Sequence, residues 1–469
     1  MKALFGTDGI RGEAGRFPLD AATVSAIGFS LASHLAGRGD TPRIVIGRDT
    51  RESGEAIEQA LIQGAVQAGA KCLSAGVITT PGVAFLTRKL EASAGVVISA
   101  SHNPYQDNGI KIFAPSGQKM DDSVERRIEA DIHSKNGRAG ASPSSGLVLP
   151  INRTSQEEGL APAASSPELK DKLRQEYLSF LAGEIGKDLN LAGLTIVIDC
   201  ANGASSALAP VLFSRLGANV IAINATPDGR NINRDCGSLH IESLREKVLQ
   251  ERADLGVAFD GDADRSLFVD GDGNFVDGDA TLWALATHLQ AHGRLKDDVV
   301  VATVMSNIGL EIALRSAGIQ LVRTDVGDKY VLDELLRRGA SLGGEQSGHI
   351  ILPDLSLAGD GMITTLCLLR ALRESRKTLT EMTAGFKRYP QILLNVRVRE
   401  KVPFTDLASV RTAITEVEEL LSQQGRLLLR YSGTEPLARV MIEGEDQGQI
   451  EDYARRIAGA IEREIGAGL

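Results

Sequence analysis

Residues 43–76 read RIVIGRDTRESGEAIEQALIQGAVQAGAKCLSAG, and this stretch decides the fold. It opens on RIVIGRDT (43–50), whose short apolar run predicts a buried strand. From about Gly54 to Ala68 the apolar residues recur at helical spacing, and AGAKCLSAG (68–76) predicts a second strand. A strand, a helix and a strand in this order form a β-α-β unit, so the sequence predicts an α/β fold with a largely parallel sheet.

The same pattern occurs twice more, and the copies begin about 105 to 150 residues apart. This spacing predicts three similar α/β domains rather than a short-period solenoid. The second copy is LTIVIDCANGA (194–204), a helix through Phe213 and LGANVIAIN (216–224). The third copy is VVVATVMSN (299–307), a helix from about Gly309 to Arg315 and AGIQLVRT (317–324).

The last hundred residues have a different pattern. Strands at QILLNVRVRE (391–400), GRLLLRYSGTEP (425–436) and LARVMIEGE (437–445), a helix over about 406–421 and a closing helix predict a smaller α+β domain. Residues 134–168 are rich in Ser, Ala, Gly and Pro, which predicts an irregular connection. The expected domains are therefore 1–165, 166–256, 257–373 and 374–469.

Composition limits the classes of function. The 469 residues are 43% hydrophobic and 24% charged, as in ordinary globular proteins, and the net charge of −10 argues against nucleic-acid or anionic-membrane partners. No apolar stretch approaches the roughly 20 residues that cross a bilayer, and MKALFGTDGIRG predicts no signal peptide. The four cysteines form no CxxC pair, so we expect a cytoplasmic protein. The sequence does not decide between a monomer and a homodimer.

The segment FDGDADR (259–265) gives the strongest physical signal. It brings Asp260, Asp262 and Asp264 together at alternate positions, and such carboxylates repel one another unless a cation, Mg²⁺ or Ca²⁺, neutralises them. An EF-hand is excluded, because Arg265 and Gly271 stand where that loop needs Gly and Glu. A solvated acidic hairpin is the remaining alternative.

The segment SASHNPYQDNGIK (99–111) follows an apolar run, AGVVI, so Ser101 lies just after a predicted strand. A nucleophile presented in this way can carry a phosphoryl group whose oxygen completes the coordination of Mg²⁺. His102 and Lys111 add groups that carry protons or positive charge. A Ser-His hydrolase is disfavoured, because adjacent side chains on extended backbone point apart. A hydrogen-bonded turn without chemistry stays open.

Two more clusters are suited to a phosphosugar. The segment LRYSGTEPLAR (429–439) offers a strand-end arginine, hydroxyls and backbone N–H groups that can wrap an anion, and a turn without ligand is the alternative. The segment GGEQSGHI (343–350) places polar side chains at alternate positions, on one side if the backbone is extended, and a solvated turn is the alternative. No GxxxxGK(S/T) loop occurs, so a phosphoryl group has to come from the substrate or the protein itself.

Together these motifs resemble the α-D-phosphohexomutase family, most closely its bacterial branch that acts on glucosamine phosphates. The resemblance covers nearly the whole chain and rests, in family order, on FGTDGIRG, SASHNP, DNGIK, DCANGA, FDGDADR, MSNIGLE, VGDKYV, GGEQSGHI, GDG and RYSGTEPLARVMIEG. It implies three similar α/β domains and a C-terminal α+β domain around a central cleft. Two departures are the connection 134–168, which is long for the family, and Tyr431 at a variable place of its loop.

The resemblance implies an isomerase that interconverts glucosamine 6-phosphate and glucosamine 1-phosphate through a phosphoserine and a sugar 1,6-bisphosphate. The product would serve amino-sugar metabolism and peptidoglycan precursor synthesis. Asp328 matches the glucosamine branch. The alternative in the same family is a phosphomannomutase/phosphoglucomutase. A Mg²⁺-dependent sugar phosphatase or a non-catalytic binding module are further alternatives, although Arg265 does not fit the aspartyl-phosphatase pattern DxDx(T/V).

Site residues follow from the same resemblance. Ser101 is expected to be the phosphoserine and to hold Mg²⁺ with Asp260, Asp262 and Asp264. The resemblance implies catalytic roles near the transferring group for Arg11, Lys111 and His349, and substrate binding for Glu345 and Ser347 in the sugar loop and for Arg430, Ser432 and Thr434 in the phosphate loop. The chemistry of the residues themselves adds His102 as a catalytic residue, and Arg265 and Gly433 as substrate-binding residues.

Overall fold

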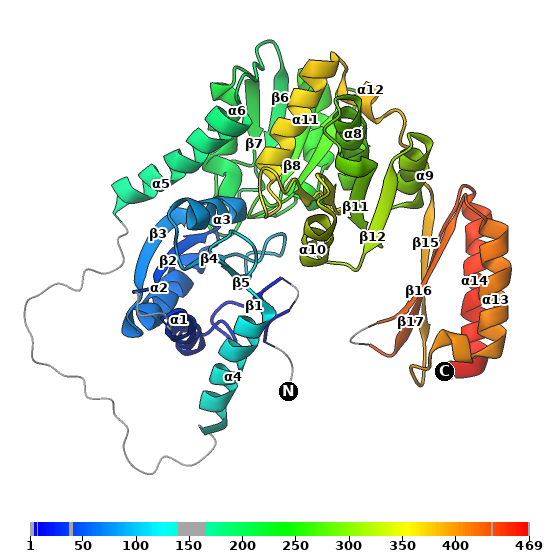
Figure 1. The fold of residues 1–469 in the computed structure, drawn as a ribbon, viewed down its shortest axis with the longest axis horizontal. Helices are drawn as coiled ribbons and strands as arrows, with labels where there is room; N and C mark the ends of the chain where they lie inside the picture. The colour runs from blue at the N-terminus through cyan, green and yellow to red at the C-terminus, as the bar shows by residue number, and fades with distance from the viewer. Residues whose placement is uncertain (1–3, 7, 37–40, 139–165, 433–434, 468–469) are drawn as a thin grey trace, which may run out of the picture. The chain divides into compact units, whose positions relative to one another are not determined.

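The computed structural model describes residues 4–6, 8–36, 41–138, 166–432 and 435–467. The chain forms two compact units, which are described separately (Figure 1). The first unit consists of Met1–Val304 and Arg323–Met382, and the second of Met305–Val322 and Thr383–Leu469. Among the described residues, no helix combines the length and the hydropathy that crossing a bilayer requires.

The first sheet has the strand order β1-β5-β4-β2-β3. Strands β2, β3 and β4 are parallel, whereas β5 and β1 are antiparallel to their neighbours. Alternate strand residues face helices α1, α2 and α4 on one side and α3 on the other. The elements are β1 (Ile10–Glu13), α1 (Ala21–Leu35), β2 (Arg43–Arg48), α2 (Gly54–Gln67), β3 (Lys71–Val77), α3 (Thr80–Lys89), β4 (Ala94–Ile98), β5 (Asp107–Phe113) and α4 (Asp122–Arg138).

The second sheet has the order β10-β9-β8-β6-β7. Strands β7 and β8 are parallel to β6, and β9 runs antiparallel to β8. The elements are α5 (Pro167–Phe180), η1 (Leu181–Ile185), β6 (Thr195–Asp199), η2 (Ala204–Ala207), α6 (Ala209–Arg215), β7 (Asn219–Ile223), η3 (Gly237–Leu239), α7 (Glu242–Glu251), β8 (Leu255–Phe259), β9 (Ser266–Asp270) and β10 (Phe275–Val276).

The domain boundary that the sequence analysis expected between residues 256 and 257 falls inside β8. The sequence shows a strand ahead of the acidic loop but not which strand pairs with it. Because β8 and β9 pair with each other on either side of the loop, we propose to group this loop with the second sheet.

In the third sheet, β11 pairs in parallel with β13, and β13 pairs antiparallel with β14. The elements from here to the end of α12 are α8 (Gly278–Ala291), η4 (Lys296–Asp298), β11 (Val299–Thr303), α9 (Ile308–Ser316), β12 (Gln320–Thr324), α10 (Asp328–Arg338), β13 (Gly343–Gly344), β14 (Ile350–Ile351), α11 (Gly361–Ser375) and α12 (Leu379–Thr383).

One topological position recurs in all three sheets. In each sheet, one strand lies parallel to the first strand of the β-α-β unit, and a turn then connects it to an antiparallel neighbour. These strand pairs are β4 and β5, β8 and β9, and β13 and β14. The three turns are the segments 99–106, 260–265 and 345–349. The predicted serine loop, acidic loop and sugar loop therefore occupy equivalent places in three repeated folds.

The C-terminal sheet is antiparallel, in the order β15-β17-β16, and packs against α13 and α14. Its elements are β15 (Gln391–Arg397), η5 (Phe404–Asp406), α13 (Ala408–Leu421), β16 (Arg426–Tyr431), β17 (Leu437–Glu443) and α14 (Gln447–Ile465). This arrangement confirms the predicted α+β character of the last hundred residues.

The predicted repeats correspond to the observed strands, and the predicted helix ends agree within a few residues. The predicted irregular connection 134–168 is wrong at both ends, because residues 134–138 continue α4 and residues 167–168 belong to α5. Buried Ile128 and Ile132 anchor α4 to the sheet, so packing extends a helix whose last turn has loop-like composition. Residues 139–165 of the predicted connection lie outside the described residues.

Candidate active site

Ser101 lies at the centre of the site, in the turn between β4 and β5. Its φ is 53°, in the left-handed region, and its side chain is 1% exposed. Its Oγ donates a hydrogen bond of 2.6 Å to Oδ2 of Asp260, and Nδ1 of His102 lies 3.3 Å from Ser101 Oγ. A strained backbone conformation for a non-glycine residue is characteristic of functional turns. It points the hydroxyl at the acidic loop of the second sheet.

Neighbouring polar groups hold this turn in place. Ser99 Oγ accepts a bond of 2.9 Å from the backbone N–H of Ser101 and donates one of 2.6 Å to Asp49 Oδ2. Both Ser99 and Asp49 are fully buried, and burial raises the pKa of the Asp49 carboxyl. A Cβ on Gly261 would lie 2.5 Å from the carbonyl oxygen of Ser101, so only glycine lets the acidic loop approach so closely.

Arg51 is a site residue that the sequence analysis missed. It follows β2, is 1% exposed, and donates from Nη2 to the carbonyl oxygens of Ser101 at 2.9 Å and Asn103 at 2.8 Å. Its Nη1 donates to the carbonyl of Asp107 at 3.0 Å, and its Nε pairs with Asp49 at 2.9 Å. A planar guanidinium with five donors thus ties both ends of the serine turn to the sheet.

Asp260, Asp262 and Asp264 are buried together between β8 and β9. Each offers a carboxylate oxygen that lies within 4.8 Å of the others. In the described part of the chain, Oδ1 of Asp262 and Oδ1 of Asp264 are buried without a hydrogen-bond partner. Unpaired buried oxygens are costly, and this hard-oxygen donor set fits a Mg²⁺ ion.

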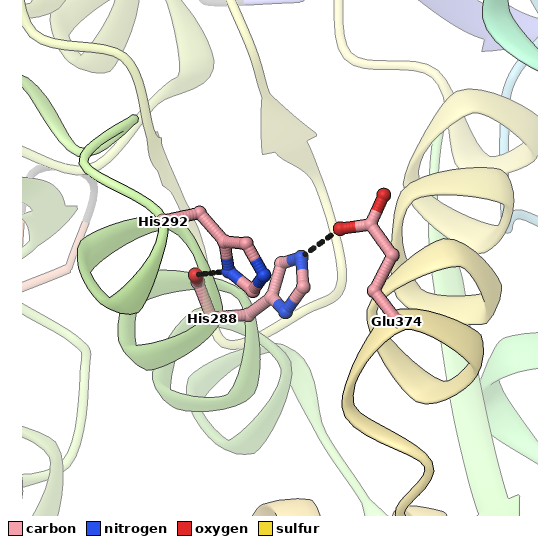
Figure 2. A group of neighbouring side chains, drawn as sticks. All are labelled: His288, His292 and Glu374. Carbon is pink, nitrogen blue, oxygen red and sulfur yellow. Dashed lines mark hydrogen bonds and ion pairs between the residues drawn. The ribbon is translucent and has the colours of Figure 1, made fainter.

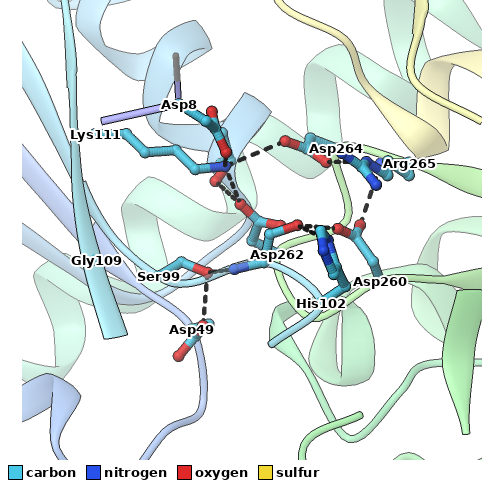
Figure 3. A network of polar contacts seen from close by, with 12 residues as sticks. Asp8, Asp49, Ser99, His102, Gly109, Lys111, Asp260, Asp262, Asp264 and Arg265 are labelled. Atoms are coloured by element: carbon cyan, nitrogen blue, oxygen red, sulfur yellow. Dashed lines mark hydrogen bonds and ion pairs between the residues drawn. The ribbon is translucent and has the colours of Figure 1, made fainter. Parts of the chain in front are cut away.

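Lys111, on β5, reaches the same carboxylates (Figure 3). Its Nζ lies 2.9 Å from Asp262 Oδ2, 3.3 Å from Asp264 Oδ2 and 3.2 Å from Asp8 Oδ2, and the residue is 2% exposed. Burial alone would lower the pKa of this ammonium, but the three carboxylates outweigh burial and raise the pKa well above its ordinary value. Lys111 is therefore a fixed positive charge beside the acidic loop.

The three carboxylates differ in how well they are compensated. Burial and repulsion by Asp264 and Asp262 raise the pKa of Asp260 well above its ordinary value. Burial would also raise the pKa of Asp264, but Lys111, His349 and Arg265 outweigh burial and lower it. The protein's own cations thus leave a deficit of positive charge at Asp260, the carboxylate that contacts Ser101.

A cavity of about 450 Å³ opens beside these residues, within the range of small-molecule sites. It combines cationic and carboxylate side chains, as a charged polar ligand requires. Its lining includes Asp8, Arg11, His102, Asp264, Arg265, Asp328, Glu345 and His349. The structure thus brings together most of the predicted catalytic residues.

The sugar loop is a tight turn and not the extended segment on which the sequence prediction depended. The backbone N–H of Glu345 donates to the carbonyl of His349 at 3.0 Å, and Gly348 has φ 88°. Ser347 Oγ lies 3.3 Å from Glu345 Oε2. The glycine permits the left-handed turn, which brings Glu345 and His349 to the cavity.

His349 lies between two carboxylates. Its Nδ1 is 3.7 Å from Asp264 Oδ1, and its Nε2 is 3.6 Å from Asp328 Oδ2. Burial would lower the pKa of this imidazole, but Asp264, Asp328 and Glu345 outweigh burial and raise the pKa to about 9. By contrast, burial, Arg265 and Arg11 lower the pKa of His102 to about 4.

Further contacts join residues that are far apart in sequence. Lys119, which the sequence analysis missed, bridges Asp8 and Asp328 at 2.7 Å each. Arg11 pairs with Asp8 and lies 3.4 Å from Asn103 Oδ1. These links connect the N-terminal strand, the first sheet and α10. The sequence carries no signal for them beyond the charges themselves.

The predicted phosphate loop belongs to the second unit. Arg430 lies on β16, and the carbonyl of Ser432 accepts a bond of 2.6 Å from Lys401 Nζ. Gly433 and Thr434 lie outside the described residues. A phosphate-binding role for this loop stays a prediction.

Comparison with known proteins identifies the family. Four models of the phosphoglucomutase/phosphomannomutase family match successive parts of the chain: α/β/α domain I at residues 2–138, domain II at 175–273, domain III at 277–389 and the C-terminal domain at 393–460. The chain belongs to this family. The family match and the predicted four-domain α/β class are thus confirmed, and the acidic loop lies within the match to domain II.

Two relatives align with nearly the whole chain. Phosphoglucosamine mutase from Solibacter usitatus is 49% identical over 99% of both chains. Phosphoglucosamine mutase from Koribacter versatilis is 47% identical over 99% of this chain and 98% of its own.

Solved structures share the fold. A phosphoglucomutase/phosphomannomutase family protein from Burkholderia thailandensis, 22% identical, has a TM-score of 0.75 and covers 98% of this chain and 97% of its own. Aspergillus fumigatus N-acetylphosphoglucosamine mutase, solved with GlcNAc-6P and magnesium, is 18% identical, has a TM-score of 0.61, and covers 98% of this chain and 95% of its own.

Proposed function

We propose that this chain is an isomerase that interconverts glucosamine 6-phosphate and glucosamine 1-phosphate. One observation carries the mechanism: Ser101 Oγ lies 2.6 Å from the buried acidic trio. A serine in this position is suited to carrying a phosphoryl group between substrate hydroxyls. The full-length relatives named phosphoglucosamine mutase support the choice of an amino sugar over mannose or glucose.

The reaction consists of two phosphoryl transfers. In the first, the bond between Ser101 Oγ and phosphorus breaks as the free 1-hydroxyl of glucosamine 6-phosphate bonds to the phosphorus and gives up its proton. The product of this step is a sugar 1,6-bisphosphate. In the second transfer, the 6-phosphoryl group moves to Ser101 Oγ, and the released 6-hydroxyl regains a proton. The enzyme ends phosphorylated and releases glucosamine 1-phosphate.

Positive charge around Ser101 does most of this work, because phosphoryl transfer depends mainly on positioning and electrostatic stabilisation. We propose that Lys111, Arg11 and Arg265 stabilise the phosphoryl oxygens. Mg²⁺, held by Asp260, Asp262, Asp264 and the phosphoserine, would supply Lewis-acid charge neutralisation there. His102 and His349 both line the cavity, and we propose that they carry the hydroxyl proton.

Substrate recognition is assigned to two loops. We propose that Glu345 and Ser347 bind the sugar hydroxyls and amino group, and that Arg430, Ser432, Gly433 and Thr434 grip the phosphate that is not being transferred. A sugar 1,6-bisphosphate would restore any enzyme that loses its phosphoryl group. The four cysteines are free thiols, which is consistent with the cytoplasmic location that we propose.

A substrate panel tests the proposed function. We expect kcat/KM for glucosamine 6-phosphate to exceed that for glucose 6-phosphate and mannose 6-phosphate by at least about tenfold, because carboxylates near the sugar loop favour an ammonium group. Initial rates with each sugar phosphate and Mg²⁺ provide the measurement. A higher value for mannose 6-phosphate would identify a phosphomannomutase, and accumulation of free phosphate would identify a phosphatase.

The Arg51→Lys enzyme tests the support of the serine turn. Lysine cannot reproduce the fork that holds the carbonyls of Ser101 and Asn103. Since a displacement of about 1 Å costs on the order of 100-fold in rate, we expect kcat to fall about 100-fold with little change in KM. Steady-state kinetics and the thermal midpoint separate this loss from unfolding.

Arg230→Lys is the matched control, because Arg230 is exposed and pairs with Glu52 at the surface. It should leave kcat unchanged. A folded Arg51→Lys enzyme with the wild-type kcat would refute the positioning role of Arg51.

A further inference from the structure

Helices α8 and α11 carry a second group of metal-ligating side chains (Figure 2). His288 lies in the last turn of α8, and His292 is the residue that caps the C-terminus of this helix. The centroids of the two rings lie 4.3 Å apart, and Glu374 projects from α11. Each offers one ligand atom, and these atoms lie within 4.8 Å of one another. None of the three lines the cavity beside Ser101.

Backbone contact orients the ring of His292. Its Nδ1 lies 2.8 Å from the carbonyl oxygen of His288. A carbonyl only accepts hydrogen bonds, so Nδ1 carries the proton and Nε2 presents its lone pair. Metal-binding histidines are typically oriented by such a bond from the other ring nitrogen.

The other two ligand atoms, His288 Nε2 and Glu374 Oε2, both lie next to the guanidinium of Arg294. Arg294 Nη2 lies 2.9 Å from His288 Nε2 and 2.7 Å from Glu374 Oε2. A carboxylate only accepts, so Glu374 Oε2 accepts from Arg294, and His288 Nε2 lies within hydrogen-bond distance of the same oxygen, at 3.0 Å.

A zinc ion fits these atoms. Two ligands about 2.0–2.1 Å from one tetrahedral ion lie roughly 3.3 Å apart, close to the separation of His288 Nε2 and Glu374 Oε2. Two histidines and one glutamate with an open fourth position form a known zinc donor set. We propose that His288, His292 and Glu374 form a Zn²⁺ site that links α8 to α11, and that Arg294 competes for it.

Displacing Arg294 is feasible because its side chain is 44% exposed, and exposed ion pairs contribute little. Arg370 Nη1, 4.0 Å from Glu374 Oε1, remains beside the other carboxylate oxygen. Leu289 stands where the HExxH helix of a metalloprotease has its glutamate, so the site lacks that general base.

Zinc titration of the full-length protein tests the proposal, with excess Mg²⁺ present to compete for the acidic loop. Calorimetry measures Kd and stoichiometry, and the thermal midpoint reports stabilisation. Loss of an outer-shell partner of a metal ligand weakens metal binding 10- to 100-fold. His292 is exposed and would be a direct ligand, so we expect His292→Ala to raise the Kd for zinc by at least this factor. His240→Ala, another exposed histidine, is the control and should leave Kd unchanged.

Arg294→Ala provides the decisive comparison. It removes the competing guanidinium, so Kd should fall by up to about 5-fold, the equivalent of an exposed ion pair. Zinc should then raise the thermal midpoint of this variant more than that of the wild type. A Kd that rises or stays unchanged in Arg294→Ala, or wild-type zinc binding in His292→Ala, would overturn the proposal.

Discussion

The Ser101→Ala enzyme will convert glucosamine 6-phosphate at least about 10⁴-fold more slowly than the wild type. The reason is chemical: without Oγ there is no atom in the turn to carry the phosphoryl group between the two sugar hydroxyls. The side chain is 1% exposed and the change removes one oxygen, so the fold should be retained. Coupled assays of glucosamine 1-phosphate formation measure the effect.

Ser33→Ala, at an exposed serine of α1, is the matched control and should retain the wild-type rate. Ser101→Ala should also keep its thermal midpoint and its affinity for Mg²⁺ through the three aspartates. Turnover of Ser101→Ala within a few-fold of the wild type, with free phosphate accumulating, would replace the mutase mechanism by a phosphatase.

The Asp262→Asn enzyme is expected to lose at least about 10³-fold in kcat and most of its Mg²⁺ affinity. Asparagine keeps the size of the side chain and an oxygen that can accept the 2.6 Å bond from Thr80 Oγ1. It removes one of the negative charges that attract the ion and that pair with Lys111. The loss should therefore come from charge rather than shape.

Mg²⁺ titrations of activity and calorimetric Mg²⁺ binding measure this change. Asp272→Asn is the control, because Asp272 is an exposed aspartate in the turn that follows β9. It should behave as the wild type. An Asp262→Asn enzyme with the wild-type Mg²⁺ dependence would show that the acidic loop does not hold the catalytic ion.

Local sequence patterns were sufficient to predict the main strands and the loops of the candidate site. Apolar runs followed by polar turns mark β4 and β8, because buried strands exclude polar residues until the chain reaches the edge of the sheet. The repeat of the β-α-β pattern also predicted that the three loops belong to similar domains. It did not show that they occupy one topological position, since that depends on which strand pairs with which.

The site residues that the sequence did not reveal make their contacts across long sequence separations or with backbone atoms. Arg51 binds the carbonyls of Ser101 and Asn103, and a carbonyl acceptor leaves no pattern in the sequence. Lys119 contacts Asp328, 209 residues away, and only the folded chain brings them together. For the sugar loop the sequence left extended backbone and a turn both open, and Gly348, with its positive φ, closes the loop into a turn.

The most direct test of the account follows the phosphoryl group itself. The enzyme is incubated with a sugar 1,6-bisphosphate that carries a labelled phosphoryl group, and the labelled peptide is sequenced. With Mg²⁺ present throughout, the account predicts label on Ser101 alone and transfer of this label to glucosamine 6-phosphate when that sugar is added. Label on another residue, or label on Ser101 that glucosamine 6-phosphate does not remove, would contradict it.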